Sequence, residues 1–283
     1  MITNTYNRPL DLVERSLRAS LSQEINPQKV ILIDQNSTPL KLSEDIKNNP
    51  LLEVQIVDAK SVSVARNKAQ YPKDIEWLCF CDDDGYMDEN YSEVLQKTIQ
   101  NDSNIEIIAG SIIRDDTFGY YSPRHAIGGD INKFRNTKLL MGSNFAVRRL
   151  TFEGLGKFDE MFGTGSYWGS GEESDFAWKA YFNNTPMIYK KELRVLHVRP
   201  YASETKEAIQ KAYNYGIGKG ALVAKWIFSN KKFTVFYELT EMTIVPFIKM
   251  IKSILKLDKK EMFTSIYSLL GRYKGIYKYL VKP

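Results

Sequence analysis

Cysteine and long apolar runs are both scarce in this chain of 283 residues. Its two cysteines, Cys79 and Cys81, are two positions apart, and a β-strand would place both on one face. A disulfide across that spacing would strain the backbone, and a CxC pair alone cannot complete a zinc site. The sequence therefore predicts two small, buried, reduced thiols, as expected for a cytoplasmic protein.

No run of eighteen uncharged apolar residues is present, and residues 1–9 lack the features of a secretory signal peptide. These absences predict a chain that is neither secreted nor inserted through a bilayer. The P-loop, GxSxG and zinc-finger patterns are also missing. With 43% hydrophobic and 26% charged residues, the composition is that of a folded globular protein, long enough for one large α/β domain or for a smaller one with an appendage.

Charge is divided unevenly along the chain. The formal net charge is +5, yet residues 200–283 hold 15 Lys and Arg against 6 Asp and Glu, a balance of +9, which leaves −4 for residues 1–199. A basic C-terminal part predicts an anionic partner, either nucleic acid or an anionic membrane leaflet.

The spacing of the basic residues favours the membrane over nucleic acid. Lysines at 249, 252 and 256 form one stripe of a helix whose remaining face is apolar. The residues of this apolar face are Phe247, Ile248, Met250, Ile251, Ile254, Leu255 and Leu257. A second segment, 267–280, combines tyrosine and leucine with Arg272, Lys274 and Lys278. Basic amphipathic helices of this kind lie on membrane surfaces; the alternative is that their apolar faces pack against the rest of the protein.

Short apolar runs alternate with helical patterns in the N-terminal half. The runs have the form of buried parallel strands and lie at 30–33, 54–57, 77–80 and 105–108, with a further strand expected at 193–198. Apolar residues recur every three or four positions in 10–21 and 91–99, which predicts helices there. The alternation predicts an α/β fold with a mostly parallel sheet flanked by helices. The glycine-rich stretch 142–171 is expected to be loop, and helices are expected from residue 201 to the end.

Polar side chains follow three of the predicted strands, where open parallel sheets bind ligands. Asp34 follows one strand, Asp82-Asp83-Asp84 another, and His197 comes near the end of the last. Adjacent carboxylates repel one another and lose solvation when buried, and a divalent cation removes that conflict. Carboxylate oxygens suit Mg²⁺ or Mn²⁺, which commonly bridge a protein to substrate phosphates. The aspartates therefore predict a metal site, the alternative being an exposed acidic turn.

A second cluster follows the glycine-rich loop 163–171. The loop carries Tyr167 and Trp168, and three carboxylates, Glu172, Glu173 and Asp175, lead from it into a predicted helix. Carboxylates in a first helical turn are stabilised by the helix dipole, which is the purely structural explanation. The functional one is a general base that takes a proton from an acceptor hydroxyl, beside aromatic rings that stack on a sugar.

Seven short segments in this order resemble the family 2 glycosyltransferases, which have a GT-A fold. The segments are TYNRP (5–9), IDQNS (33–37), ARN (65–67), DDD (82–84), GSNFAVRR (142–149), GKFDEMF (156–162) and GEESD (171–175). The stretch YWGSGEESD is also similar to the acceptor-site loop of β-1,4-galactosyltransferases. The resemblance covers about residues 1–200 and implies a GT-A domain there, while the basic amphipathic pattern predicts a helical extension over 201–283 that either associates with a membrane or packs on the body. Two departures are the pair Glu172-Glu173, where the family usually reads Glu-Asp, and a short first strand.

The resemblance implies an inverting, metal-dependent transfer of a sugar from a nucleotide diphosphate donor, preferably a UDP-sugar, to a hydroxyl of a saccharide or lipid-linked acceptor. The implied donor-binding residues are Thr5, Tyr6, Arg8, Asp34, Arg66, Asn67, Asp82 and Asp83. Asp84 and His197 would hold Mn²⁺ or Mg²⁺, with Asp82 on the ribose or the metal. Glu173 would be the base, although its neighbour Glu172 is the alternative. The implied acceptor contacts are Tyr167, Trp168, Glu172 and Asp175.

The expected setting is surface polysaccharide synthesis, with the protein peripheral on the inner face of the cytoplasmic membrane and without a nucleic acid partner. One alternative is a catalytically silent sugar-nucleotide-binding or scaffolding subunit. Another is a nucleotidyltransferase, which the sequence disfavours because no glycine-rich basic loop follows a first strand. His125 is expected in surface or loop packing, and the glycines of 215–220 in a close helix contact or an acceptor-lipid channel.

Overall fold

The computed structural model describes residues 1–198 and 205–282 and divides into two compact units. The N-terminal unit consists of residues 1–159 with the described residues from 176 to 198, and the C-terminal unit of 160–175 with 205–282. The predicted boundary between residues 200 and 201 lies outside the described residues. The segment 160–175, which the prediction assigns to the first domain, groups with the C-terminal helices.

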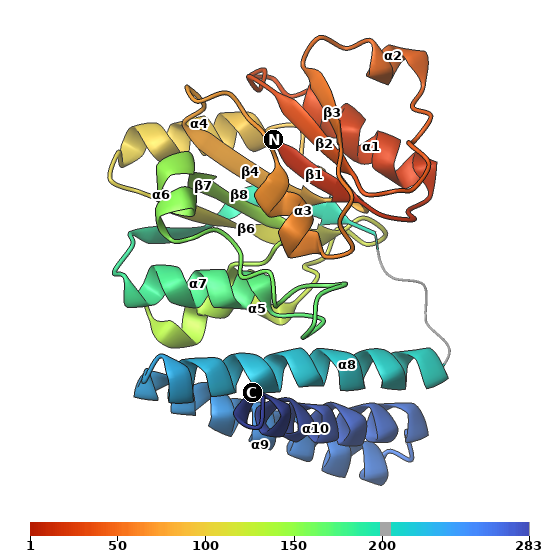
Figure 1. Cartoon of the computed structure of the whole chain (residues 1–283), viewed down its shortest axis with the longest axis vertical. Helices are drawn as coiled ribbons and strands as arrows, with labels where there is room; N and C mark the ends of the chain where they lie inside the picture. Colours follow the sequence, from red (N-terminus) through yellow and green to blue (C-terminus); the bar gives the residue numbers. More distant parts are fainter. Residues whose placement is uncertain (199–204, 283) are drawn as a thin grey trace. The chain divides into compact units, whose positions relative to one another are not determined.

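An eight-stranded mixed sheet forms the centre of the N-terminal unit, in the order β3-β2-β1-β4-β7-β6-β8-β5 (Figure 1). Its strands are β1 (Ile2–Thr5), β2 (Val30–Asp34), β3 (Leu52–Ile56), β4 (Trp77–Asp82), β5 (Gly85–Met87), β6 (Ile107–Arg114), β7 (Asn144–Arg148) and β8 (Met187–His197). Strands β3, β2, β1 and β4 are parallel, as are β6 and β8, whereas β7 and β5 are antiparallel to their neighbours. The predicted α/β class is confirmed, and all five predicted strands are present.

The prediction that residues 142–171 are loop is wrong for their first part. Strand β7 and helix α6 (Arg149–Gly154) both lie there. Between Gly142 and Gly154 there is no glycine, and Phe145 stacks on Phe80 of β4 at 4.9 Å. A buried strand therefore forms because the apolar run 145–147 fills the sheet, whatever the glycine content on either side.

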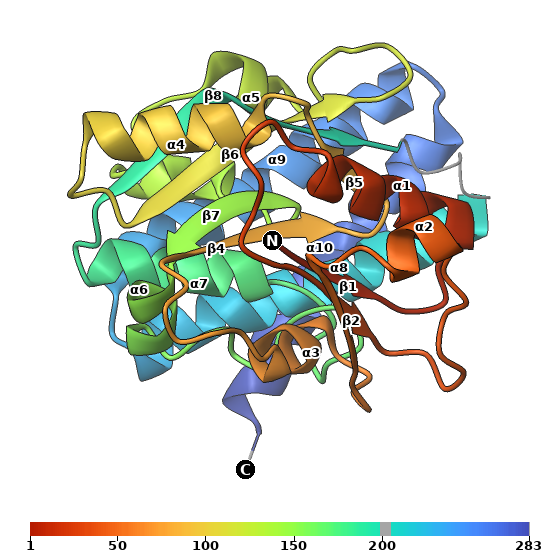
Figure 2. The same ribbon diagram turned by 90° about the horizontal axis from the view of Figure 1, so that it is seen from above.

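Helices cover both faces of this sheet (Figure 2). Helices α1 (Leu10–Leu21) and α4 (Tyr91–Asn101), both predicted, lie on one face with α2 (Glu44–Lys47). Helices α3 (Val62–Lys68), α6 and α7 (Glu172–Phe182) lie on the other, where five phenylalanine rings form the core: Phe80, Phe145, Phe152, Phe158 and Phe176. Cys79 and Cys81 face α4 instead and are buried and free, as predicted. The short α5 (Pro123–Ile127) and a 3₁₀ helix (Phe134–Leu139) complete the unit.

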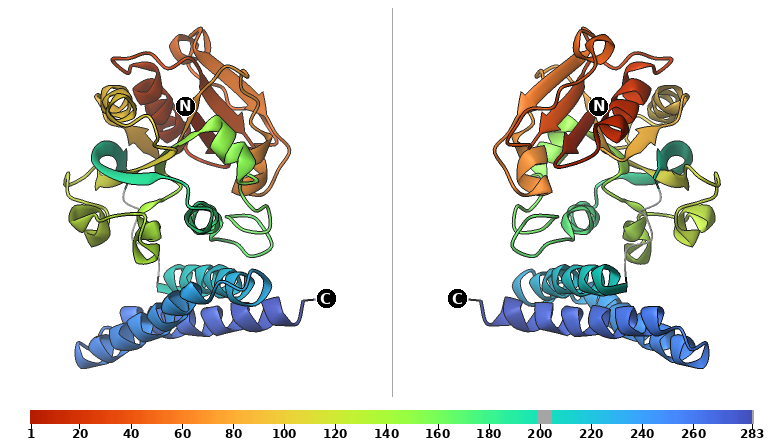
Figure 3. Two further views of the ribbon diagram at one scale, coloured as in Figure 1. Left: turned by 90° about the vertical axis from the view of Figure 1, so that its left-hand side faces the viewer. Right: turned by 90° about the vertical axis from the view of Figure 1, so that its right-hand side faces the viewer.

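The C-terminal unit is helical, as predicted, with α8 (Thr205–Ala224), α9 (Phe236–Leu255) and α10 (Lys259–Leu280) (Figure 3). A π-helical turn (Lys225–Ser229) and a 3₁₀ turn (Phe233–Val235) join α8 to α9. Glycines let α8 and α10 touch: a Cβ on Gly220 would lie 1.8 Å from the Arg272 carbonyl oxygen, and one on Gly275 2.1 Å from that of Ile217. The close helix contact predicted for residues 215–220 is therefore confirmed.

Helix α9 exposes many large apolar side chains. Its buried residues include Glu238 and Ser253, whereas its exposed residues include Phe247 and Leu255, at 50% and 79%. The whole apolar face predicted for 247–257 is exposed, apart from the half-buried Met250. No helix in the described parts of the chain is long and apolar enough to cross a bilayer.

Candidate functional site

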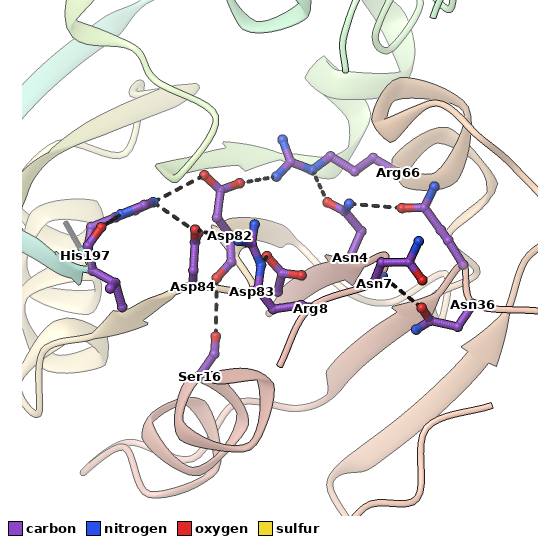
Figure 4. A network of polar contacts seen from close by, with 12 residues as sticks. Asn4, Asn7, Arg8, Ser16, Asn36, Arg66, Asp82, Asp83, Asp84 and His197 are labelled. Atoms are coloured by element: carbon purple, nitrogen blue, oxygen red, sulfur yellow. Dashed lines mark hydrogen bonds and ion pairs between the residues drawn. The ribbon is translucent and has the colours of Figure 1, made fainter. Parts of the chain in front are cut away.

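Asp82, Asp84 and His197 meet at the carboxyl end of β4, with one potential ligand atom of each lying within 4.8 Å of the others (Figure 4). Side chains alternate along an extended chain, so Asp82 and Asp84 point one way and Asp83 the other. Antiparallel pairing of β5 with β8 sets Gly85 opposite His197, and the Val198 amide donates to the Asp84 carbonyl at 3.1 Å. The fold therefore assembles a cluster from residues more than a hundred positions apart in the sequence.

The three side chains lie close enough to one another for their charges to interact. His197 Nε2 lies 3.2 Å from Asp84 Oδ1 and 3.8 Å from Asp82 Oδ2. Burial lowers the pKa of His197, but its hydrogen bonds to Asp82 and Asp84 outweigh that effect and raise the pKa to about 10. Burial likewise raises the pKa of Asp82, and its bonds with His197 and Arg66 reverse this and lower it to about 2.

The donor set fits a divalent cation. The His197 Nδ1 lies 2.8 Å from the Val198 carbonyl oxygen, and a proton there leaves Nε2 directed at Asp82 and Asp84. That is the tautomer a metal-bound imidazole requires, with its second nitrogen donating to a backbone carbonyl. Two carboxylates and one imidazole suit Mn²⁺ or Mg²⁺. Asp82, expected on the ribose or the metal, belongs to this cluster with Asp84 and His197.

Arg66 holds Asp82 in place. Its guanidinium is 2% exposed and donates from Nη2 to Asp82 Oδ1 at 2.7 Å and from Nε to Asn4 Oδ1 at 2.8 Å. Asn4 lies opposite Asp82 in the β1–β4 pairing. Sequence reasoning missed Asn4, although Asn4 directly precedes the TYNRP segment and lies next to Thr5 on the short first strand, β1.

Arg8 supplies positive charge on the other side of the aspartates. Its Nε lies 2.9 Å from Asp83 Oδ1 and its Nη1 3.1 Å from Asp84 Oδ2. Burial raises the pKa of Asp83, and the positive charge of Arg8 opposes that rise. Thr5 is buried, whereas the ring of Tyr6 is 54% exposed and free to stack on a flat ligand.

Two other predicted donor residues bind loops of the protein. Both oxygens of the buried Asp34 accept hydrogen bonds, from the Asn36 amide at 2.9 Å and the Leu40 amide at 2.8 Å. The Asn67 side chain donates to the Phe158 carbonyl at 2.9 Å and accepts from the Phe158 amide at 3.1 Å. Asp34 and Asn67 thus shape the loops at this end of the sheet, and contact with the donor stays a prediction for both.

The predicted acceptor residues, which lie within 167–175, belong to the C-terminal unit, whereas the aspartates belong to the N-terminal unit. Glu172 and Glu173 line a cavity of about 440 Å³ together with Ser170, Tyr215, Lys219 and Arg272. No local pattern in the sequence indicated that Lys219 of α8 or Arg272 of α10 would join this cavity.

Asp175 differs from the two glutamates. It is fully buried, and one carboxylate oxygen accepts from Lys225 Nζ at 2.6 Å and from Trp226 Nε1 at 2.8 Å. This pair of bonds ties the start of α7 to the π-helical turn that follows α8, so we assign Asp175 to the framework of the cavity.

The aromatic pair also divides into two roles. Tyr167 is exposed, whereas Trp168 is buried between Phe162 and Tyr279, with its ring 4.7 Å from Tyr167. Tyr167 is therefore the ring that a ligand can reach.

Comparison with known proteins agrees with these observations. The model of the family described as glycosyl transferase family 2 matches residues 1–156, and no curated protein sequence matches this chain. Among solved structures, the mannosyltransferase PcManGT from Pyrobaculum calidifontis, in complex with GDP-Man and Mn²⁺, is 15% identical with a TM-score of 0.62, over 99% of this chain and 86% of that one. S. aureus TarS 1–349, in complex with UDP-GlcNAc, is 15% identical with a TM-score of 0.56, over 99% and 90%.

These likenesses show a GT-A-like fold, and the family match covers more than half of the chain. With the carboxylate and imidazole cluster at the end of β4, they lead to one conclusion: this chain is a glycosyltransferase that belongs to glycosyl transferase family 2.

Proposed function

We propose that the enzyme transfers a sugar, with inversion, from a nucleotide diphosphate donor to a hydroxyl of a saccharide or lipid-linked acceptor in surface polysaccharide synthesis. The observation that carries the proposal is the cluster of Asp82, Asp84 and His197 in a family 2 chain. The two compared structures hold GDP-Man and UDP-GlcNAc, so nucleotide diphosphate sugars are the class of donor to test, with UDP-sugars first.

The residues of the N-terminal unit serve the donor. Asp82, Asp84 and His197 would hold Mn²⁺ or Mg²⁺, which when bound supplies positive charge to the leaving diphosphate. Arg66 keeps Asp82 oriented, and Arg8 adds a cation beside Asp83 and Asp84.

The residues of the C-terminal unit serve the acceptor. Glu173, or its neighbour Glu172, accepts the proton of the acceptor hydroxyl while the oxygen of that hydroxyl forms a bond to the anomeric carbon. The bond from that carbon to the donor phosphate breaks, and the electron pair leaves with the nucleoside diphosphate. Attack opposite the leaving group inverts the anomeric configuration.

We further propose that the protein works as a peripheral protein on the inner face of the cytoplasmic membrane. Support comes from the exposed apolar side of α9, which Lys249, Lys252 and Lys256 accompany. An apolar face with flanking lysines suits the boundary between acyl chains and anionic headgroups.

Thermal stability in the presence of UDP, GDP, dTDP or CDP, each with Mn²⁺, Mg²⁺ or EDTA, tests the donor site. A ligand at a hundred times its Kd stabilises a folded protein by about 2.7 kcal/mol, so one nucleotide should raise the Tm and lose the effect in EDTA. Asp84→Asn should abolish the shift, whereas Asp74→Asn, an exposed carboxylate at the amino end of β4, should keep it.

Absence of any shift would overturn the donor assignment. A shift without release of UDP or transfer of sugar from the matching donor would instead identify a silent sugar-nucleotide-binding subunit.

A further inference from the structure

The cavity beside Glu172 and Glu173 adjoins a second one within the C-terminal unit. The second cavity, of about 400 Å³, is lined by residues of α8, α9 and α10 and of the turn between α9 and α10. Both cavities are lined by Ala212, Ser268 and Arg272, so they meet at these residues. We refer to the two adjoining cavities together as the hollow; their lining residues extend from the two glutamates, past Arg272, to α9.

Arg272 stands at the junction with hydrogen-bonding capacity left over. Its Nη1 donates to the Met242 carbonyl, while its buried Nε has no acceptor among the described residues. A guanidinium offers five N–H donors in a planar fork that matches phosphate oxygens. A buried donor without an acceptor is costly, and an oxyanion at this junction would relieve that cost.

Further charges line the hollow on either side of Arg272. Lys219 lies in the first cavity and is paired with Glu238 at 2.6 Å, and Lys249 and Lys260 lie in the second. The acidic residues of the second cavity are Asp258, which caps α10 by accepting from the Glu261 amide, and Glu261 itself. The second cavity therefore holds three cations, Arg272, Lys249 and Lys260, against two carboxylates, Asp258 and Glu261.

The far end of the hollow is formed by the apolar helix α9. Val245 and Lys249 line the second cavity and are exposed residues of α9. On the same helix, Pro246 also lines the second cavity, and Ile248 and Ile251 are exposed. A ligand in the hollow would thus meet carboxylates, then a guanidinium, then an apolar surface.

We propose, on the basis of the proposed function, that the acceptor is an amphiphile with a phosphate or diphosphate between its apolar chain and its reacting hydroxyl. The phosphate binds at Arg272 and Lys249, the apolar chain lies along α9, and the hydroxyl reaches Glu172 and Glu173. The enzyme therefore glycosylates a lipid-linked phosphate in preference to a free saccharide.

Binding of farnesyl diphosphate, farnesol and inorganic pyrophosphate to the full chain tests this site. Calorimetry is carried out in EDTA, so that a metal at the aspartate cluster cannot capture the diphosphate. We expect farnesyl diphosphate to bind at least tenfold more tightly than farnesol or pyrophosphate. Arg272→Gln and Lys249→Gln should each remove most of the advantage over farnesol, and Lys252→Gln, an exposed lysine of α9 outside both cavities, should keep it.

Equal affinity for farnesyl diphosphate and farnesol would overturn the phosphate site, and pyrophosphate binding as tightly as farnesyl diphosphate would overturn the amphiphile. Should Arg272→Gln unfold because its bond to Met242 is lost, the exposed Lys249→Gln decides the question. The nucleotide-dependent Tm shift with Mn²⁺, measured on the same variants, should be unchanged. A wild-type protein that lacks this shift but binds farnesyl diphosphate would contradict the proposed function and leave the phosphate site standing.

Discussion

Three consecutive aspartates divide between two sides of the chain because side chains alternate along the strand end. Asp82 and Asp84 share His197, whereas Asp83 faces Arg8. Two of the three are thus available as metal ligands on one side, and the third fixes a cation on the other. The repulsion expected among adjacent carboxylates is balanced within the protein by Arg8, Arg66 and His197.

Glu173→Gln tests the base at the level of one atom. The amide cannot accept the hydroxyl proton, so transfer should fall by about 10² to 10⁴-fold, the usual contribution of a general base. Nucleotide affinity should not change, since Glu173 is not among the donor residues. Initial rates and nucleotide titration measure the two quantities, with Glu172→Gln as the matched neighbour. Loss of transfer in Glu172→Gln alone would reassign the base to Glu172, and normal transfer in both variants would show that neither is the base.

His125 offers a prediction about pH. It is completely buried rather than on the surface, with its ring stacked on Tyr189 and its Nδ1 accepting from the Ile112 amide at 3.4 Å. Burial lowers its pKa to about 4, and the nearby charge of Arg124 adds to the effect. Between pH 6.5 and 4, His125 therefore binds a proton in the unfolded chain but not in the folded protein. As the pH falls through this window, His125 lowers the free energy of unfolding.

The free energy of unfolding, measured in urea at pH 7 and pH 5, checks this effect. The wild-type protein should lose more stability on acidification than His125→Gln, by up to about 1.4 kcal/mol per pH unit. Identical losses in the two proteins would show that His125 is protonated in the folded state.

At the scale of elements, the contact between α8 and α10 depends on glycine. The backbones approach so closely at Gly216, Gly220, Gly271 and Gly275 that any Cβ would overlap the opposite helix. Glycine within a helix costs about 1 kcal/mol relative to alanine, so its repeated use here indicates that close packing compensates.

Gly220→Ala should destabilise the protein, because the new Cβ would lie 1.8 Å from the Arg272 carbonyl oxygen and the helices must separate. Overpacking of this kind costs about 1 to 3 kcal/mol. Gly154→Ala at the end of α6 is the control, since a Cβ there meets nothing within 4 Å. Calorimetry should show a lower Tm for Gly220→Ala and an equal or higher one for Gly154→Ala. A Tm that falls in neither variant would mean that the helices tolerate separation.

At the scale of the whole molecule, the charge composition and the exposed apolar side chains of the C-terminal part both support its proposed contact with a membrane. Residues 200–283 carry the +9 balance, and the exposed residues of α9 and α10 include large apolar side chains such as Phe247, Leu255 and Tyr277. Large exposed apolar patches often mark interaction sites, and these side chains therefore support the proposed membrane contact.

Vesicle flotation with phosphatidylglycerol-containing and purely zwitterionic liposomes tests the membrane proposal. Ile251→Glu with Leu255→Glu should weaken binding by roughly tenfold or more, because burying one such side chain contributes about 1.5 to 3 kcal/mol. Leu150→Glu, at a position that is 69% exposed but in the N-terminal unit, is the control and should bind normally. Added salt should weaken binding to the anionic liposomes. Failure of the wild-type protein to bind either liposome would contradict the proposal.

The sequence by itself determined the features that depend on short range. The apolar run at 30–33 predicted a strand, and the recurrence of apolar residues every three or four positions in 91–99 predicted a helix, because such patterns are local properties of a sequence. The order of seven short segments indicated the family. The sequence could not reveal β7, whose Phe145 forms a strand by packing on Phe80. Only the tertiary structure decided that Asn4 and Arg66 support Asp82, that Asp175 is bound by Lys225, and that Arg272 joins the cavity of Glu173. Those contacts join residues far apart in the chain, and distance along a sequence carries no information about which of them folding brings together.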